Sequence, residues 1–140
     1  MSFLQRYQRH FFSDADNCQH IVMDEQGHIE ESDDKLFSTQ SLLHAPVTAW
    51  NHFVESIFPS LLQLAPESPE VHFYKVEPDH LALMPGYYDF SFRCLHQEGA
   101  KKYILWKILD LTSDYVSLKH NQQNSHDTEI SRQLKELTQR

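Results

Sequence analysis

Residues 101–120, KKYILWKILDLTSDYVSLKH, contain a change of periodicity that decides the fold. Up to Leu109, apolar side chains alternate along both faces of an extended chain, which indicates a strand. After the triplet DLT at 110–112, apolar residues recur at intervals of three and four, which indicates a helix. Thr112 is a good N-cap for that helix, a role worth about 1 kcal/mol. The stretch therefore predicts a strand over 101–111 that passes into a helix without an intervening loop.

The predicted strand is apolar on both faces, so both faces need a partner. Alternation divides its side chains into two sets, which are Ile104, Trp106 and Ile108 on one face and Tyr103, Leu105, Leu109 and Leu111 on the other. One face is expected to meet the main packing layer, and the other a flanking helix or a second subunit. The pattern does not indicate which face meets which partner.

The composition is that of a folded protein of ordinary domain size. The chain has 140 residues, of which 40% are hydrophobic, and a formal net charge of −8. An acidic chain repels phosphate groups and Lys101-Lys102 is an isolated basic pair, so no nucleic-acid or membrane contact is predicted. No apolar run approaches the roughly 20 residues needed to span a bilayer. The two cysteines form no metal or redox motif and no secretory signal is recognisable, so a cytoplasmic location is expected.

Helical spacing occurs in four segments, which are 1–12, 33–43, 48–64 and 112–140. The apolar stripe of the first consists of Phe3, Leu4, Tyr7 and Phe11. The third carries Trp50, Phe53, Val54, Ile57 and Phe58. In that segment Thr48 is the expected N-cap, and Pro59 is expected to kink or restart the helix. The last helix has a polar middle near Gln122, so it is expected to need a partner for stability.

Strand spacing surrounds the helical middle of the chain. Residues 20–24 and 28–31 flank the turn Glu25-Gln26-Gly27 and predict a hairpin. Further strands are expected over 71–77, 80–84 and 87–96, and a turn at 97–100 leads into the strand at 101–111. In the strand over 87–96, alternation separates Tyr88, Phe90, Phe92 and Cys94 from Asp89, Ser91 and Arg93. The sum is an α+β fold, with a roughly five-stranded antiparallel sheet covered by helices on one face.

Two motifs at the ends of this element order resemble those of PAS (Per-Arnt-Sim) sensor domains. The first is the hairpin IVMDEQGHI at 21–29, and the second is DLT at 110–112, which is similar to the triplet found where the last PAS strand passes into an output helix. The resemblance implies a PAS-like sensor domain over 20–112. It also implies a flanking amphipathic helix within 1–19 and a C-terminal signalling or coiled-coil helix over 113–140.

The resemblance implies a regulatory role in signal transduction rather than catalysis. Asp110 and Thr112 would relay a signal from the sheet to the helix, and through it to an effector such as the histidine kinase of a two-component system or a cyclase. The chain would form a homodimer, with an interface made by Phe3, Leu4, Tyr7, Phe11, Tyr115 and Leu118. A small-molecule ligand would bind between sheet and helices, in a pocket lined by Phe53, Ile57, Tyr88, Phe90, Phe92 and Trp106. The same aromatic side chains equally suit a filled core, and the sequence does not separate the two.

Signals for other chemistry are weak. The ten histidines show no metal-ligand spacing, so no metal site is predicted. His52 on the long helix is the one candidate for a haem ligand, and Asn17-Cys18 lies too early in the chain for a flavin-binding motif, so neither cofactor is favoured. His126-Asp127 superficially resembles a phospho-acceptor site but lacks its neighbours. Three glycines are too few for a phosphate-binding loop, and no nucleophile motif is present.

Two other function classes remain open. One is a small α+β enzyme or ligand carrier with a helix-capped substrate cavity, which would need polar pairs facing that cavity. Only His96 and Lys107 have an ambiguous orientation in this respect. The other is a dimerisation module with a filled core.

Overall fold

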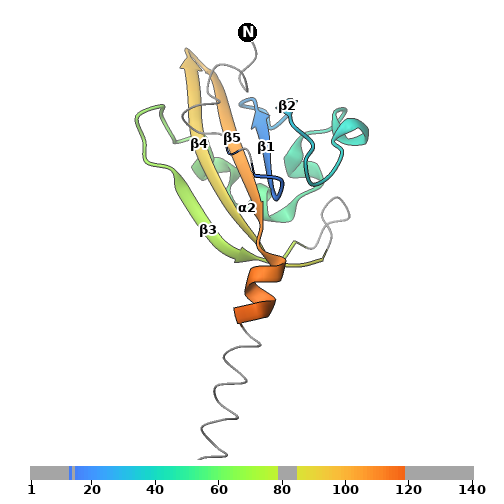
Figure 1. The fold of residues 1–140 in the computed structure, drawn as a ribbon. Coiled ribbons are helices and arrows are strands. Elements are labelled where there is room, and N and C mark those ends of the chain that lie inside the picture. The colour runs from blue at the N-terminus through green and yellow to red at the C-terminus, as the bar shows by residue number, and fades with distance from the viewer. Residues whose placement is uncertain (1–12, 14, 79–84, 119–140) are drawn as a thin grey trace, which may run out of the picture.

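The computed structural model describes residues 13, 15–78 and 85–118, and confirms the α+β class. Five antiparallel strands form one sheet in the order β2-β1-β5-β4-β3 (Figure 1). Their bounds are Cys18–Met23 for β1, Ile29–Ser32 for β2, Val71–Val76 for β3, Tyr88–Glu98 for β4 and Lys101–Asp110 for β5. The predicted helix at 1–12, the strand at 80–84 and the helix beyond 118 lie outside the described residues.

Helical segments connect β2 to β3, and the last of them lies behind the sheet in Figure 1. They are the short 3-10 turns η1 (Gln40–Leu42) and η2 (Val47–Ala49), followed by the α-helix α2 (His52–Leu61). A second helix, described over 112–118, follows β5 directly and leaves the sheet at its end (Figure 1). The strand therefore passes into the helix at the predicted position, with Leu111 alone between them.

The central strand β5 has two different neighbours on its two faces. Ile104, Trp106 and Ile108 belong to the main core, which they share with β1, β4 and α2. On the opposite face, Leu105 is buried with Val22 and Leu95, and Tyr103 packs against them. The predicted alternation is confirmed, and the first set is the one that faces the helical layer.

The hairpin between β1 and β2 forms as its sequence predicts. The carboxylate oxygen Oδ1 of Asp24 accepts hydrogen bonds from the backbone N–H groups of Gln26 and His28, both at 2.9 Å. Gly27 has a φ of 84°, a left-handed conformation that side chains disfavour, and its N–H bonds to the Asp24 carbonyl at 3.0 Å. Asp24 and Gly27 are thus both required by the turn.

The helix predicted over 33–43 is wrong. Only η1 is helical there, because the buried side chain of Gln19 binds this segment in a non-helical form. Gln19 Oε1 accepts from the N–H groups of Leu36 and Phe37 at 2.8 and 2.9 Å, and Asp34 has a φ of 48°. The spacing of apolar residues did not show that a side chain of β1 would bond to these backbone N–H groups and so replace the hydrogen bonds of a helix.

The start of the long helix also differs from the prediction. Asn51, not Thr48, is the N-cap of α2, since its Oδ1 accepts from Val54 N–H at 3.0 Å. Thr48 lies within η2 instead. Pro59 lies in the last turn of α2, where few backbone bonds follow, and the helix continues through it to Leu61 rather than restarting.

Candidate functional site

The junction of β5 with the helix is fixed by the side chain of Thr112. Its Oγ accepts a hydrogen bond from Tyr87 N–H at 3.0 Å and donates to Asp110 Oδ1 at 2.7 Å. The same carboxylate oxygen accepts from Thr112 N–H at 3.0 Å, which caps the first turn of the helix. Leu111 N–H donates to the Tyr87 carbonyl at 3.0 Å. Thr112 and Asp110 therefore bond the start of the helix to the chain just before β4.

The start of β1 is bonded to the same place. Asp110 N–H donates to the Asn17 carbonyl at 2.8 Å, and the Asn17 side-chain amide donates to the Asp110 carbonyl at 3.1 Å. Asn17 directly precedes β1, so the first and last strands end at one junction. Asp110 is thus bound through its backbone to one strand and through its carboxylate to the helix.

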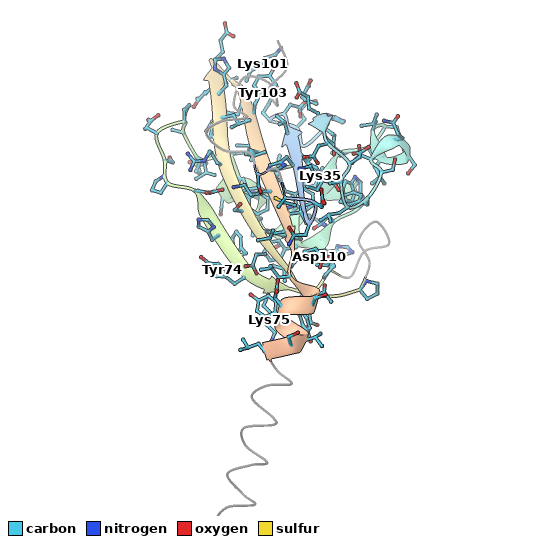
Figure 2. All side chains as sticks on the ribbon, in the orientation of Figure 1. Lys35, Tyr74, Lys75, Lys101, Tyr103 and Asp110 are labelled. Atoms are coloured by element: carbon cyan, nitrogen blue, oxygen red, sulfur yellow. The ribbon has the colours of Figure 1, made fainter. Side chains whose placement is uncertain are left out.

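A third connection runs from the helix to β3 and β4. Tyr115 OH donates to Asp89 Oδ1 at 2.9 Å, and Lys75 N–H donates to the same oxygen at 2.9 Å. Lys75 has a φ of 55° at an irregularity of β3, and its Nζ lies 5.3 Å from the ring centre of Tyr87 and 5.8 Å from that of Tyr115. Figure 2 shows Lys75 beside the first turns of the helix and Asp110 at the end of β5.

We call the set Asn17, Lys75, Tyr87, Asp89, Asp110, Thr112 and Tyr115 the junction. Asp110 and Thr112, the two predicted relay residues, are bonded to each other in the structure. The others were missed as members of this set, because their contacts join segments distant in sequence. Burial raises the pKa of Tyr88, the first residue of β4, and the negative charge of Asp110 adds to that rise.

Gly86, which precedes Tyr87, has no room for a side chain. A Cβ atom placed there would lie 2.2 Å from Thr112 Oγ, closer than real contacts allow. The close approach of Gly86 to Thr112 depends on the tertiary structure and was not predicted from the sequence. The absence of a side chain lets the backbone before Tyr87 reach the threonine hydroxyl.

The predicted pocket residues lie together in the main core. Phe53 contacts Phe90 edge to face with ring centres 5.4 Å apart, and Trp106 lies 5.2 Å from Phe90 and 6.1 Å from Phe92. Ile57 packs against the same cluster and Tyr88 is buried in it. Within the described part of the chain, Nε1 of Trp106 is buried and has no hydrogen-bond acceptor. That ligands bind here stays a prediction.

Of the predicted dimer residues, only two are described. Tyr115 packs against its own chain, with Tyr87 at 5.8 Å between ring centres. Leu118 is exposed, as is Val116. Phe3, Leu4, Tyr7 and Phe11 lie outside the described residues, so the interface stays a prediction.

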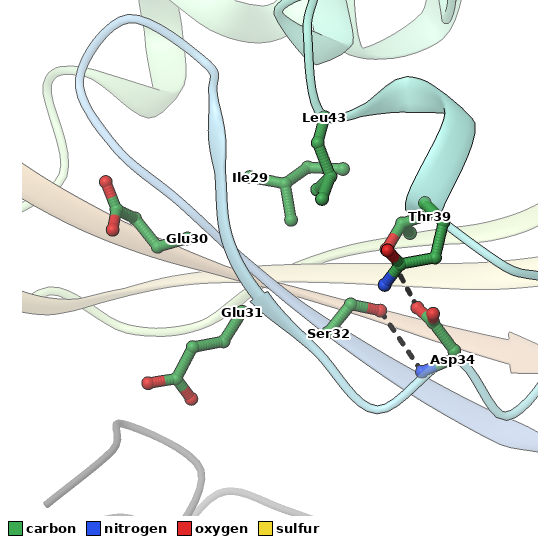
Figure 3. Close-up of a pocket in the computed structure, with 8 residues that line it drawn as sticks. Ile29, Glu30, Glu31, Ser32, Asp34, Thr39 and Leu43 are labelled. Atoms are coloured by element: carbon green, nitrogen blue, oxygen red, sulfur yellow. Dashed lines mark hydrogen bonds between the residues drawn. The ribbon is translucent and has the colours of Figure 1, made fainter.

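A surface pocket of about 330 Å³ lies between β2 and the segment 34–43. Asp34 Oδ1 accepts a hydrogen bond from the Thr39 hydroxyl at 2.9 Å, and Asp34 N–H donates to Ser32 Oγ at 3.2 Å (Figure 3). Figure 3 shows the side chains of Glu30 and Glu31 directed away from Asp34. Within this pocket Asp34 is thus bonded to Thr39 and Ser32.

The outer face of the sheet carries a charged cluster around Glu70. Its carboxylate lies 3.6 Å from Lys107, 3.7 Å from Arg93 and 3.8 Å from His72. Burial raises the pKa of Glu70, but Lys107, a Ser91 hydrogen bond and Arg93 outweigh it, so the pKa lies below its ordinary value. Lys107, one of the two ambiguous positions, therefore faces an ion cluster on the outer face. The other, His96, stacks on Tyr103 on that same face.

Among the residues that the structure describes, no three His, Cys, Asp or Glu side chains are placed to hold a metal ion. No helix within that part of the chain combines the length and apolarity required for crossing a bilayer. Comparison with known protein families yields no match, and comparison with curated proteins yields none either.

Proposed function

We propose that the chain is a non-catalytic regulatory domain of the PAS type that transmits a signal through its C-terminal helix. The single observation that carries this proposal is the junction, in which one helix is bonded to the ends of several strands. A hinge there would absorb displacement, whereas Thr112 bonds to Asp110 on one side and Tyr87 on the other. A shift of β1, β4 or β5 against one another therefore changes the position of the helix.

The bonds of the junction suit a switch of modest energy. Each neutral hydrogen bond contributes about 1 kcal/mol, and one to a charged group somewhat more. Breaking two or three of them costs a few kcal/mol, which a ligand or a partner is able to supply. The exposed Val116 and Leu118 on the helix are available to a second subunit or an effector.

The remaining parts of the proposal follow from the resemblance to PAS sensors. The chain acts in the cytoplasm as a homodimer, and the effector is a histidine kinase or a cyclase. The signal is a small molecule bound between sheet and helices. The buried indole N–H of Trp106 supports such a ligand, because a bound acceptor atom would satisfy it.

Joining the chain in frame to the catalytic core of a histidine kinase tests the relay. Single residues inserted between the helix and the kinase core, one to four in turn, rotate the kinase relative to the sheet by about 100° each. Autophosphorylation is expected to rise and fall with the helical repeat. Two glycines inserted after Thr112 are expected to abolish that dependence. A rate that is the same across the whole series contradicts the relay.

The second candidate is a small-molecule carrier without a relay, which the buried Trp106 N–H also favours. Native mass spectrometry of the purified chain distinguishes the candidates when combined with the kinase series. A bound molecule together with a flat kinase response indicates a carrier. A bound molecule together with a periodic response indicates a sensor.

A further inference from the structure

Three side chains that suit thiol chemistry contact one another at the outer face of β1. They are the thiol of Cys18, the imidazole of His20 and the carboxylate of Asp33. The Sγ atom of Cys18 is 3.8 Å from Nε2 of His20, and Nδ1 of His20 is 2.8 Å from Oδ2 of Asp33. Cys18 and His20 are two residues apart on one strand, so they share a face. This is the order of nucleophile, base and orienting carboxylate found in thiol catalysis. This grouping was not predictable from the sequence, because Asp33 belongs to the segment after β2.

The hydrogen bonds determine where the imidazole proton lies. The N–H of Ser13 donates to His20 Nε2 at 3.0 Å, so that nitrogen carries a lone pair and the proton is on Nδ1. Nδ1–H then donates to Asp33, whose other oxygen accepts from His20 N–H at 3.0 Å. In this tautomer the ring nitrogen without a proton is the one that faces the thiol, as a general base requires.

In this arrangement the base is occupied and the thiol is covered. Ser13 N–H takes the lone pair that the Cys18 proton would need, and Cys18 is only 1% exposed. Lys35 fixes the covering segment, since its Nζ donates to the carbonyls of Ser13 and Ala15 at 3.1 and 3.2 Å. The structure therefore shows a closed form of the site.

We propose that Cys18, His20 and Asp33 form a peroxide-sensitive thiol site that is inactive while Ser13 covers it and reactive when that segment is released. The proposal does not depend on the relay through the helix. It concerns a modification site on β1 and the class of reagent that it takes, which is a hydroperoxide.

The reaction balances with the groups present and one peroxide. In the released form, His20 Nε2 removes the thiol proton, and the thiolate attacks one oxygen of hydrogen peroxide. An S–O bond forms, the O–O bond breaks, and the departing hydroxide takes the proton from His20 as water. The product is a sulfenic acid, with sulfur oxidised by two electrons and peroxide reduced by two.

The charges around the thiol favour this chemistry once water is admitted. Burial raises the pKa of the Cys18 thiol in the closed form, Lys107 lowers it, Asp33 raises it and Lys35 lowers it. Release of the covering segment removes part of the burial. Lys107, which pairs with His20 across β1 and β5, remains beside the site.

The test uses the full chain with Cys94→Ser, so that Cys18 is the single thiol. Ser13→Pro removes the N–H that blocks His20, and Ser13→Ala retains it as the matched control. Sulfenic acid formed by hydrogen peroxide is trapped with dimedone and followed by mass spectrometry at pH 7. Ser13→Pro is expected to raise the rate about tenfold or more, and Ser13→Ala to leave it within about twofold.

Two further readouts separate base catalysis from simple exposure. Adding His20→Gln to Ser13→Pro should remove the gain. In Ser13→Pro, the rate of sulfenic acid formation should fall less than about threefold between pH 8 and 7. In the variant that also carries His20→Gln, it should fall about tenfold over the same range. Equal rates for the two Ser13 variants, or a gain that survives His20→Gln, overturn the proposal.

If circular dichroism shows that Ser13→Pro prevents folding, Lys35→Met is used in its place to release the covering segment. It loosens the same segment without altering the N–H of Ser13. It should raise the rate in a manner that again depends on His20. A rate unchanged by Lys35→Met in a folded chain would likewise refute the gating role of this segment.

Discussion

Thr112 combines two functions that are usually divided between residues. Its hydroxyl accepts from Tyr87 N–H and donates to Asp110, while its own N–H caps the helix through the same carboxylate. A β-branched side chain of this size fits against Gly86 only because that residue lacks a Cβ. The hydroxyl, rather than the shape of the side chain, should therefore determine the strength of the junction.

Replacing Thr112 with Val keeps the shape and removes the hydroxyl, whereas Thr112→Ser keeps the hydroxyl. Because Tyr87 N–H loses its acceptor, Thr112→Val is expected to destabilise the fold by about 1–2 kcal/mol in urea unfolding. Thr112→Ser should cost less than about half of that. Equal losses for the two variants would show that the bonds to the hydroxyl contribute little.

Among single residues, Asp110 and Thr112 were predictable as neighbours at the start of the helix because they are adjacent in sequence. The prediction that Thr112 is the N-cap was wrong, because Thr112 is already helical and the Asp110 carboxylate accepts its N–H, while its hydroxyl bonds to Tyr87 and Asp110 instead. Lys75 and Asp89 were not predictable, because their positions depend on the irregular pairing of β3 with β4. The Cys18–His20 pair was not predicted, because the strand was expected to begin at His20 whereas β1 begins at Cys18. Asp33 joins it only through the fold.

At the level of elements, β5 holds the sheet together since it pairs with β1 on one side and β4 on the other. This strand was predictable because apolar residues occupy both sets of alternating positions, as expected for a strand that is buried on both faces. The segment 33–43 was not predictable, because Gln19 satisfies its backbone from a different element. On the outer face, the charged cluster of Glu70 joins the entry to β3 with β4 and β5.

Glu70→Gln tests that cluster through its pH dependence. The pKa of Glu70 is depressed in the folded state, so its stabilisation is complete above its ordinary value of 4.5 and is lost as the pH falls through the folded value. Urea unfolding should show the variant about 1 kcal/mol less stable than the parent at pH 7. The difference should shrink steadily below pH 4.5. A difference that stays constant from pH 7 to 3 contradicts a role for the ionised carboxylate.

At the scale of the whole molecule, the sheet has one face covered by α2 and the other partly apolar. Val22, Leu95 and Leu105 are buried on the outer face, where the cluster includes only Tyr103 as a further described residue. The apolar stripe of residues 1–12 is suited to such a surface. It is also the stripe through which we propose that two copies associate.

Disrupting that stripe should abolish the dimer. Deletion of residues 1–12, or the pair Phe3→Ser and Tyr7→Ser, is expected to give monomers in analytical ultracentrifugation. The matched control is the pair Gln5→Ser and Arg9→Ser on the opposite side of the predicted helix. A monomeric parent, or a deletion variant that still sediments as a dimer, would refute this interface.

Hydrogen exchange at the junction tests most directly whether the helix and the strands move together. The amides of Asp110 and Leu111 bond to Asn17 and Tyr87, and that of Tyr115 bonds within the helix. In the parent chain these three amides should exchange with protection factors within about threefold of one another, as one cooperative unit. With two glycines inserted after Thr112, Tyr115 should lose protection about tenfold or more while Asp110 stays protected. If Tyr115 in the parent already exchanges much faster than Asp110 and Leu111, the helix opens independently and the relay is contradicted.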